Sequence, residues 1–328
     1  MKENIRKVLE MWEKGIPLNE IEASMNLTTH EFNKTLKAIR DLGYNSERVF
    51  YNDGRIIMKP SKRLNLNPTN NIRINVKSNR FRTIFISDLH IGSRGAKPEY
   101  LKQVVYEYAL PRGIHIIFNG GDVIENIYPE SPEKPIIPTV EGQIKKAISI
   151  HPHEPNLTYF MLYGNHDYKS ILDKGLDIGR YINDIRYDMV SLGYGKSTIY
   201  LKDDRIILTH ELRNHGDNSH SDDYLIFKGH SHKSKNRENK IIYIPSLSEG
   251  KNTSYEFQPL TGFLDVEFIF YSNKISRVNI RQLAFVNKEI RLANEETIIL
   301  REPKERPRGK TLTKKPKKFS NNSQDSKK

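Results

Sequence analysis

The sequence has no cysteine in its 328 residues, and no apolar run approaches the roughly 20 residues that are needed to span a bilayer. The absence of cysteine excludes disulfide bonds and thiolate metal sites, so any metal ion must be held by His, Asp, Glu or Asn. Those ligands suit Mn, Fe, Zn or Mg. The N-terminus, MKENIRKVLEMWEKG, also lacks the apolar stretch of a signal peptide. We therefore expect a cytoplasmic protein with no membrane segment.

The net charge of +13 is distributed unevenly along the chain. Residues 1–80 carry 15 Lys and Arg against 9 Asp and Glu, and residues 303–328 carry 10 against 2. The residues between them carry 28 against 29, so the middle of the chain is nearly neutral. Basic flanks attract polyanions, most often nucleic acid, although an excess of Lys and Arg can also serve solubility alone.

The first 45 residues show the apolar spacing of three helices. The first helix would bury Trp12 and end at Gly15 and Pro17, and a short second helix would follow. Thr28 and Glu31 form a capping box that predicts the start of the third helix. Two short helices that are joined by a tight turn match helix-turn-helix geometry.

A hairpin is predicted after these helices, because the turn residues Asn52-Asp53-Gly54 separate apolar stretches at 49–51 and 56–58. Helices and hairpin in this order resemble a winged helix-turn-helix domain over residues 1–60. The exposed face of its third helix could enter a DNA major groove. The residues that we expect to contact nucleic acid are Asn33, Lys34, Lys37 and Arg40. The alternative is that this module docks on the next domain or on another protein.

The rest of the chain divides by composition into four parts. Residues 61–80 are polar and read as a linker. From residue 81 apolar strands alternate with helices, and after about 186 strands dominate, which indicates an α/β domain over 81–285. Residues 286–302 read as a C-terminal extension, and the Lys-rich, Pro-rich residues 303–328 as a disordered basic tail.

Five short polar blocks each follow an apolar run in the 81–285 segment. Strand ends in an α/β sheet direct their loops to one edge, where ligands bind, so we expect these blocks to meet. Two ions about 3.5–4 Å apart need a bridging carboxylate, which Asp122 can supply. The blocks are Ser87-Asp88-Leu89-His90, Gly120-Gly121-Asp122, Gly164-Asn165-His166-Asp167, Thr209-His210 and Gly229-His230-Ser231-His232.

This ordered set of motifs, D-x-H, G-D, G-N-H-D, H and G-H-x-H, resembles the signature of the calcineurin-like metallophosphoesterases. The resemblance covers about residues 81–285. It implies a β-sandwich flanked by helices in four α/β/β/α layers, and a dinuclear centre that hydrolyses phosphate esters. Mn is the favoured metal, with Fe, Zn or Mg as alternatives.

The resemblance also implies a role for each site residue. One ion would take Asp88, His90, Asp122 and His232, and the other Asp122, Asn165, His210 and His230. His166 would be the catalytic histidine, acting as general acid on the leaving oxygen. Glu125, three residues after Asp122, would be the carboxylate that orients it, the alternative being an ordinary exposed Glu at a helix start.

Two departures from the family pattern guide the functional prediction. The Ser/Thr phosphatase branch has arginines after its second and third motifs, where this chain has Asn126 and Tyr168. The Ser-Asp-Leu-His-Ile-Gly and Gly-Asn-His-Asp stretches are instead similar to those of the recombination-repair nuclease branch. A long helical extension of the kind that docks an ATPase is not indicated by the sequence. Two further histidines, His151 and His153, are expected in a surface loop.

These observations predict a dinuclear-metal-dependent phosphodiester hydrolase, a DNA-processing nuclease that is brought to its substrate by the N-terminal module. DNA is favoured over RNA as the partner, and the sequence leaves the oligomeric state open. The alternatives are a phosphomonoesterase acting on nucleotides or phosphoproteins, and a non-catalytic DNA-binding regulator.

Overall fold

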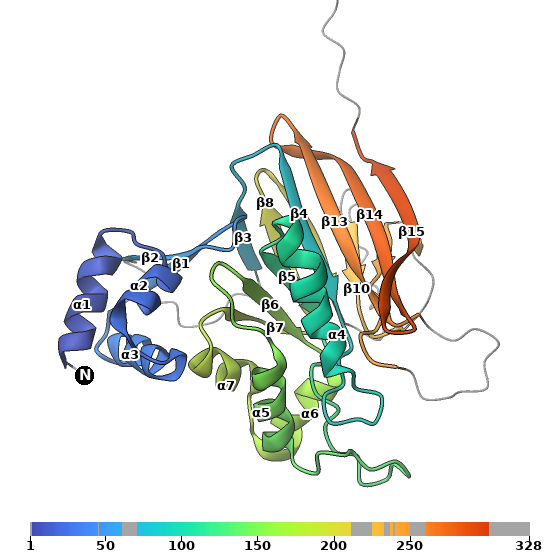
Figure 1. The fold of residues 1–328 in the computed structure, drawn as a ribbon, viewed down its shortest axis with the longest axis horizontal. Coiled ribbons are helices and arrows are strands. Elements are labelled where there is room, and N and C mark those ends of the chain that lie inside the picture. Colours follow the sequence, from blue (N-terminus) through green and yellow to red (C-terminus); the bar gives the residue numbers. More distant parts are fainter. Residues whose placement is uncertain are drawn as a thin grey trace, which may run out of the picture.

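A computed structural model describes residues 2–44, 46–60, 71–210, 225–232, 237–238, 240–249 and 260–301. The chain folds into two β-sheets that pack face to face, with helices on one side and an N-terminal helical unit at one end (Figure 1). The basic tail at 303–328 and the first half of the expected linker, 61–70, lie outside the described residues. Among the residues that are described, no helix is both long enough and apolar enough to cross a membrane.

The first sheet has seven strands in the order β15-β14-β13-β4-β5-β6-β7. Strands β4 to β7 are parallel to one another, whereas β13, β14 and β15 add antiparallel pairs. The strands are β4 (Arg80–Ile86), β5 (Ile116–Gly120), β6 (Thr158–Tyr163), β7 (Met189–Tyr194), β13 (Gly262–Tyr271), β14 (Lys274–Val286) and β15 (Glu289–Ile299).

The second sheet has eight strands in the order β11-β12-β10-β9-β8-β3-β1-β2. Its strands are β1 (Ser46–Tyr51), β2 (Ile56–Pro60), β3 (Asn71–Asn75), β8 (Lys196–Leu201), β9 (Asp204–Thr209), β10 (Leu225–Lys228), β11 (Arg237–Glu238) and β12 (Ile241–Tyr243).

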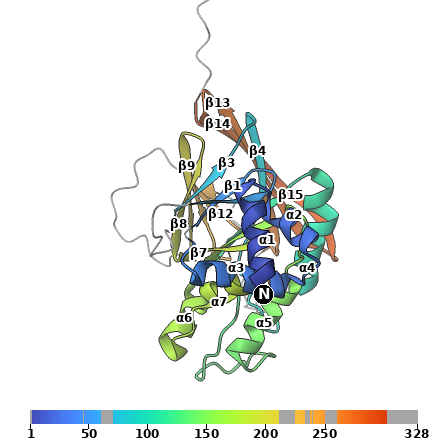
Figure 2. The same ribbon diagram turned by 90° about the vertical axis from the view of Figure 1, so that its left-hand side faces the viewer.

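Two hydrophobic cores hold these layers together. Strand β4 contributes to both, because Phe85 faces the core between the sheets while Ile84 and Ile86 face the helices. The helices that cover this outer face are seen in Figure 1 and are α4 (Pro98–Gln103), which continues into a π-helical turn (Val104–Ala109), α5 (Val140–Ile150), α6 (Asn165–Lys174) and α7 (Ile178–Ile185). The β-sandwich is confirmed. Among the described residues, no helical layer covers the outer face of the eight-stranded sheet (Figure 2).

The N-terminal unit has the predicted elements, α1 (Lys2–Glu13), α2 (Leu18–Met25) and α3 (Thr29–Asp41), followed by the β1–β2 hairpin. The capping box of α3 is present, with the Thr28 hydroxyl accepting from the Glu31 N–H. The hairpin is not a free wing, however. Strand β1 pairs with β3 in parallel, and β3 in turn pairs with β8, so the hairpin forms the edge of the large sheet.

The expected linker is therefore partly a strand, and the N-terminal unit shares its core with the rest of the chain. Phe32 packs edge-on against Tyr187 with ring centroids 5.6 Å apart, and Phe50 packs against Phe160 at 5.0 Å. The Thr158 hydroxyl also donates to the carbonyl of Gly54. Sequence could not reveal this docking because the apolar face of each helix has the same spacing whichever partner covers it.

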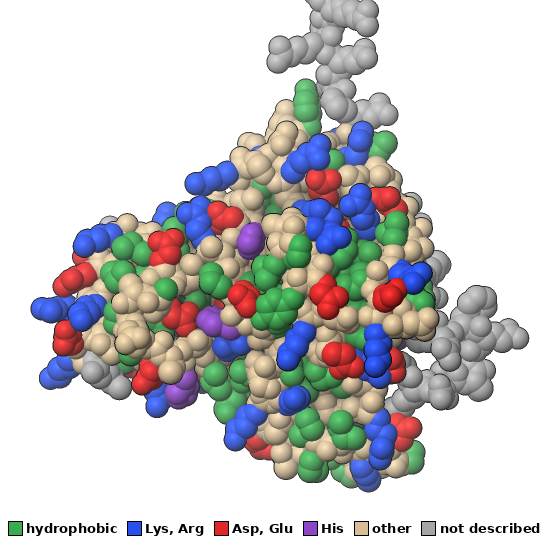
Figure 3. Space-filling view, in the orientation of Figure 1, with side chains coloured by type: hydrophobic (Ala, Val, Ile, Leu, Met, Phe, Trp, Pro, Cys, Tyr) green, Lys and Arg blue, Asp and Glu red, His purple; other side chains and the backbone are tan. Residues whose placement is uncertain are grey.

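The predicted nucleic-acid face of α3 is only partly available. Asn33 is 3% exposed and donates to the Thr29 carbonyl, so its expected contact with nucleic acid is wrong. Arg40 forms an ion pair with Asp184 at the end of α7. Lys34 and Lys37 are exposed as predicted. Figure 3 shows Lys and Arg mixed with Asp and Glu over the N-terminal helices on this face, without a patch of one sign.

The histidines that were expected in a surface loop are instead buried or ion-paired. His151 is 2% exposed, and burial lowers its pKa to about 4. His153 lies between Asp188 (3.0 Å) and Glu22 of α2 (3.2 Å), which also accepts from the Tyr187 hydroxyl. This ion-paired cluster ties α2 to the turn before β7.

The cluster predicts that docking of the N-terminal unit weakens at alkaline pH. Burial acts to lower the pKa of His153, but hydrogen bonds to Asp188 and Glu22 raise it to about 9, above the ordinary value of about 6.5, while nearby Arg186 opposes this. The stabilisation is therefore complete below about pH 6.5 and is lost as pH rises through about 9. Allowing for solvent screening of a side chain that is 30% exposed, we expect on the order of 2 kcal/mol.

Glu22→Gln isolates this effect. Urea unfolding should show the variant less stable than the parent protein at pH 7, with the difference shrinking towards zero at pH 10. Titration of Lys and Tyr at that pH affects both proteins equally and cancels. A difference that stays constant between pH 7 and pH 10 would contradict the assignment of the charge to His153.

The C-terminal boundary at residue 285 also differs from the expectation. The segment predicted as an extension, 286–302, contains β15. This strand pairs with β14 along its whole length, from the pair Val286 and Glu289 beside the turn to the pair Arg277 and Ile299 at the far end. Its pattern of exposed and half-buried side chains, typical of an edge strand, carries too few apolar residues for the sequence to reveal it.

Candidate metal centre

All five polar blocks lie at the carboxyl ends of strands, as expected. Strands β4, β5 and β6 are parallel neighbours in one sheet, and β9 and β10 are parallel neighbours in the other. The loops that follow these strands meet across the edge of the sandwich. His210, for example, donates from Nδ1 to the Gly120 carbonyl at 2.6 Å, which joins the loop after β9 to the loop after β5.

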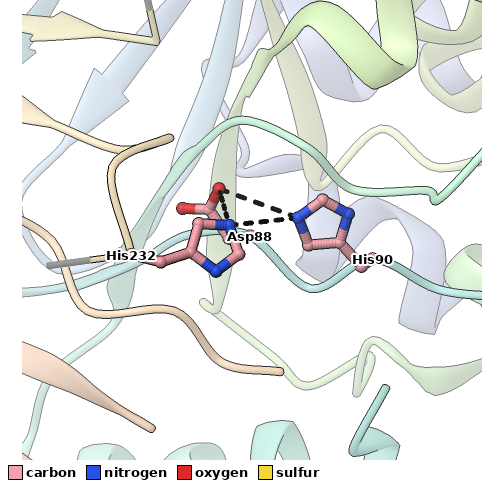
Figure 4. Close-up of side chains that lie close together, drawn as sticks. All are labelled: Asp88, His90 and His232. Atoms are coloured by element: carbon pink, nitrogen blue, oxygen red, sulfur yellow. Dashed lines mark hydrogen bonds and ion pairs between the residues drawn. The ribbon is translucent and has the colours of Figure 1, made fainter. Parts of the chain in front are cut away.

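One cluster consists of Asp88, His90 and His232, whose donor atoms all lie within 4.8 Å of one another (Figure 4). The Nε2 of His232 lies 3.1 Å from Asp88 Oδ1, and the Nε2 atoms of His90 and His232 are 3.3 Å apart. Asp88 and His90 come from the loop after β4, and His232 comes from the loop after β10. A D-x-H and an H-x-H block therefore place their side chains around one point.

A second cluster consists of Asp122, His210 and His230. The Nε2 of His210 is 2.9 Å from Asp122 Oδ2 and 4.0 Å from Asp88 Oδ1. The Nε2 of His90, from the first cluster, is 3.9 Å from Asp122 Oδ2. The two clusters are therefore contiguous, and the carboxylate of Asp122 lies between them.

Backbone strain marks the same residues. Among the described non-glycine residues, positive φ angles occur at thirteen positions, and five of those are Asp88 (55°), His90 (45°), Asp122 (51°), His230 (68°) and His232 (47°). Such conformations are costly for side chains of this size and persist where the surrounding structure enforces them, most often at functional sites. No sequence pattern reveals this feature.

Two glycines leave the space that His210 and Asp122 occupy. A Cβ on Gly164 would lie 2.2 Å from Asp122 Oδ1 and 2.4 Å from the His210 ring, although its backbone angles are open to any residue. A Cβ on Gly121 would lie 2.3 Å from His210 Nδ1, and its φ of 114° also disfavours a side chain. The glycines of the second and third blocks are thus required by the close approach of the ligand side chains.

The protonation pattern of this cluster fits a bound cation. Because His210 donates from Nδ1 to a carbonyl, Nε2 is the ring atom that faces the carboxylate oxygen 2.9 Å away. A ring nitrogen and a carboxylate oxygen this close need a positive charge between them, which either a proton or a metal ion can supply. Asp88 Oδ1 is likewise buried and has no hydrogen bond of good geometry among the described residues, although three imidazole nitrogens lie 3.1–4.0 Å away.

The pKa values show the same demand for positive charge. Burial acts to lower the pKa of His210, but the hydrogen bond to Asp122 and the charges of Asp88 and Asp122 raise it to about 9. Burial acts to raise the pKa of Asp88, yet the close approach of the His232 ring nitrogen at 3.1 Å and the charge of His210 hold it well below its usual range. Two buried carboxylates among four imidazoles are a donor set suited to divalent metal ions.

Asn165 and His166 open helix α6. Asn165 is exposed at the first position of the helix, and no hydrogen bond of its side chain is found among the described residues. The His166 backbone N–H donates to Asp122 Oδ1 at 3.0 Å, and its ring packs edge-on against His90 with centroids 4.7 Å apart. Its Nδ1 donates to the backbone carbonyl of Glu125 at 2.7 Å, which leaves Nε2 available.

Glu125 does not take the position that was expected for its side chain. The carboxylate lies 2.9 Å from His90 Nδ1 and 3.9 Å from His166 Nδ1. The backbone carbonyl of Glu125, rather than its carboxylate, therefore orients His166. The carboxylate holds His90 with Nε2 directed at the cluster, as carboxylates commonly do for metal-bound histidines.

We expect Glu125→Gln to lower metal affinity about 10–100-fold, because a neutral amide supports the basicity of His90 less well. The backbone contact to His166 is retained in this variant, so loss of activity should be recovered by added metal. The measurement is a titration of Mn against activity and against bound metal. If saturating Mn leaves kcat strongly reduced, the carboxylate acts on His166 after all.

Asp167 has a positioning role that sequence reasoning missed, although it is part of the third block. It is fully buried and accepts from the backbone N–H groups of Val123, Ile124 and Gly164 at 2.9–3.1 Å. Burial and the charge of Asp122 raise its pKa to about 7. Asp167 thereby fastens the loop after β5 to the start of α6. The only sign of this role in the sequence was that Asp167 lies in the same block as Asn165 and His166.

The sandwich with clustered Asp and His at one edge defines a metal-dependent hydrolase of phosphate esters. The chain belongs to the calcineurin-like phosphoesterase family, whose pattern matches residues 81–272. Members of this family bind divalent metal ions, in agreement with the two clusters.

None of the curated proteins matches the chain. Among solved structures, the chain is similar to the nuclease MPE of Pseudomonas putida, with 12% identity, a TM-score of 0.33, and coverage of 76% of this chain and 100% of that one. It is also similar to GAP50, the anchor in the inner membrane complex of Plasmodium, with 11% identity, a TM-score of 0.36, and coverage of 69% and 90%.

Proposed function

We propose that the protein is a phosphodiester hydrolase that uses two divalent metal ions and acts on DNA. The observation that carries the preference for diesters is the environment of Asn126. Its side chain is buried and donates to the His166 carbonyl at 2.7 Å, so it positions His166 and offers no positive charge to a substrate. Tyr168, the other position at which phosphatases carry an arginine, is exposed beside Tyr194.

This difference in charge separates the two substrate classes. A phosphomonoester carries a charge of about −1.5 to −2 at neutral pH, whereas each phosphodiester carries about −1. A site without guanidinium groups at these two positions is better matched to the lower charge. Asn126 is held firmly, since its backbone N–H donates to Gln143 at 2.7 Å.

The roles of the ligands follow from the clusters. One ion would be held by Asp88, His90, Asp122 and His232, and the other by Asp122, Asn165, His210 and His230. When bound, such ions supply the Lewis acidity that activates water and neutralises charge on phosphate oxygens. Mn is our preferred metal, because the donors mix carboxylate, amide and imidazole.

His166 would provide the proton for the leaving oxygen. Because Nδ1–H is engaged by the Glu125 carbonyl, the proton that reaches the substrate must leave from Nε2. The hydrogen bond also fixes the orientation of the ring, which limits the entropy lost on reaching the transition state.

DNA is the proposed substrate because of where the charge lies. The first 80 residues carry a net charge of +6, and the segment 81–302 is nearly neutral. Basic residues away from the metal ligands would attract a polyanion without tightening the metal site around a small anion. This distribution of charge favours nucleic acid over a free nucleotide as the substrate.

A panel of substrates tests the proposal. The purified full-length protein is assayed with Mn, Zn or Mg on labelled DNA, labelled RNA, bis-p-nitrophenyl phosphate and p-nitrophenyl phosphate, beside Asp122→Asn. We expect hydrolysis of DNA and of the chromogenic diester with Mn, slow hydrolysis of the monoester, and none with Asp122→Asn. Faster turnover of the monoester would instead identify a phosphomonoesterase. Activity on none of the four substrates would contradict the proposal.

A further inference from the structure

A cavity of about 1000 Å³ lies between the N-terminal unit and the phosphoesterase domain, apart from the metal ligands. Its walls come from α3, the β1–β2 hairpin and β3 on one side, and from α7, β7 and β8 on the other. Figure 2 shows α3, α7, β7 and β8 grouped at one side of the molecule. The cavity therefore exists only because the N-terminal unit is docked.

Positive charge predominates in this cavity. Three acidic side chains line it, Asp41, Glu47 and Asp184, and one of them is already paired with Arg40. Twice as many basic side chains line it, namely Lys37, Arg40, Arg48, Lys59, Arg73 and Arg180. Five of these six residues belong to the basic first 80 residues of the chain, and only Arg180 comes from the phosphoesterase domain.

Arg48 on β1 is one of the residues that line the cavity. Its Nη1 donates to the Asn183 side-chain oxygen at 3.1 Å and to the Tyr187 carbonyl at 3.5 Å, and both acceptors are neutral. Among the described residues, no carboxylate pairs with Arg48 and nothing accepts from its Nε or Nη2. Burial and the charge of nearby Arg40 lower the pKa of Arg48 to about 10, although the charges of Asp184 and Asp188 act to raise it. A half-buried guanidinium with unused donors favours an anion as its partner.

The other basic residues fall into two groups. Arg40 and Arg73 are already engaged, by Asp184 and by the Lys202 carbonyl respectively, and Arg73 also stacks on Tyr200. Lys37, Lys59 and Arg180 are exposed and have no ion pair within the described parts of the chain. Arg40 and Arg73 therefore form part of the cavity wall. Lys37, Lys59 and Arg180, together with Arg48, are available to a ligand.

We propose that this cavity binds the phosphate backbone of a nucleic-acid strand through Arg48, Arg180 and Lys37. Guanidinium groups match phosphate oxygens in a bidentate manner, and basic side chains spread along a groove suit successive phosphates. The volume is at the upper end of the range for small-molecule sites, about 300–1,000 Å³, which leaves room for more than a single phosphate. The choice of ligand rests on the proposed function.

The site differs from the one that sequence predicted for the N-terminal unit. The prediction was that α3 would act as a recognition helix in a DNA major groove. In the structure α3 forms one wall of the cavity, and the docked β1–β2 hairpin supplies Arg48. Contacts of this kind hold the backbone and carry no sequence information. Binding should therefore be strong at low salt and indifferent to base sequence.

Binding without turnover tests the proposal. The full-length protein, kept in EDTA, is titrated into a labelled oligonucleotide of about 20 nucleotides, and anisotropy gives Kd at several NaCl concentrations. The double variant Lys37→Ala/Arg180→Ala should bind at least about 10-fold more weakly, with a shallower salt slope by roughly 1–2. The control, Lys145→Ala/Arg277→Ala, removes the same charges from exposed positions on α5 and β14 and should bind within about two-fold of the parent.

Three results would overturn the site. The first is binding by the double variant that equals that of the parent protein. The second is an equal loss in the control pair, which would show that only net charge matters. The third is tight binding of inorganic phosphate that displaces the oligonucleotide completely, which would identify a small-anion site. Arg48→Lys keeps the charge but loses the guanidinium fork, and should weaken oligonucleotide binding. Its melting temperature is measured as well, because the guanidinium also donates to Asn183 and to the Tyr187 carbonyl.

The outcome is separable from that of the proposed function. Failure of the parent protein to hydrolyse DNA with Mn would reject the proposed reaction while anisotropy still reports on the cavity. Conversely, DNA hydrolysis by a protein whose cavity variants bind normally would reject the cavity alone.

Discussion

Gly164→Ala should reduce phosphodiester hydrolysis by at least about 100-fold while the protein remains folded. Glycine at this position is followed directly by Asn165 and His166 at the start of α6. The added Cβ would lie 2.2 Å from Asp122 Oδ1 and 2.4–2.5 Å from two atoms of the His210 ring. Contacts this short cannot persist, so the carboxylate of Asp122 and the His210 ring must move. Displacement of a ligand by about 1 Å is enough to cost this much in rate.

The added Cβ would collide with Asp122 and His210, which are both proposed metal ligands, so metal content is the measurement that tests this prediction most directly. After dialysis against Mn, the parent protein should retain two ions per chain by elemental analysis, and Gly164→Ala should retain fewer than one. Gly175→Ala at the end of the same helix is the matched control. No atom lies within 4 Å of its added Cβ, but its φ is +65°, so it should lose about 1 kcal/mol of stability and keep its metal and activity. Full metal content in Gly164→Ala would contradict the close-packed centre.

The positions of the candidate ligands were predictable because each follows an apolar run that can only be a buried strand. Ile84-Phe85-Ile86 is apolar on both faces, and a strand buried on both faces must end where polarity begins, at Ser87 and Asp88. In the same way, the ends of the apolar runs at 116–118 and 206–208 predicted the positions of Asp122 after β5 and of His210 after β9. Parallel neighbours then bring those ends together without any knowledge of side-chain positions.

Contacts between distant residues were beyond such reasoning. The carboxylate of Glu125 has two histidines within reach, and whether it holds His90 or His166 depends on a rotation that spacing does not encode. Asn33 and Lys34 are adjacent polar residues on one helix, yet only Lys34 reaches solvent. The pairing of β1 with β3 joins segments that are separated by a polar stretch, so the strand propensity of either segment does not predict it. Each of these features depends on tertiary packing.

His166→Ala should slow hydrolysis of DNA by about 10²–10⁴-fold but should affect bis-p-nitrophenyl phosphate much less. A sugar alkoxide is a poor leaving group and needs a proton, whereas p-nitrophenolate leaves readily without one. The ring of His166 is oriented by the Glu125 carbonyl and is packed against His90 and Tyr128, so the proton can be delivered from a fixed Nε2. The ratio of the two rates therefore reports proton transfer separately from binding of metal.

His30→Ala provides the control, because it removes an exposed histidine from α3 and should leave both rates unchanged. Metal content should also stay at the parent level in His166→Ala, since the ring is not among the proposed ligands. An equal loss on the two substrates would mean that His166 acts on the shared phosphoryl group or supports the metal centre through His90. The general-acid role would then be wrong, even though the residue is essential.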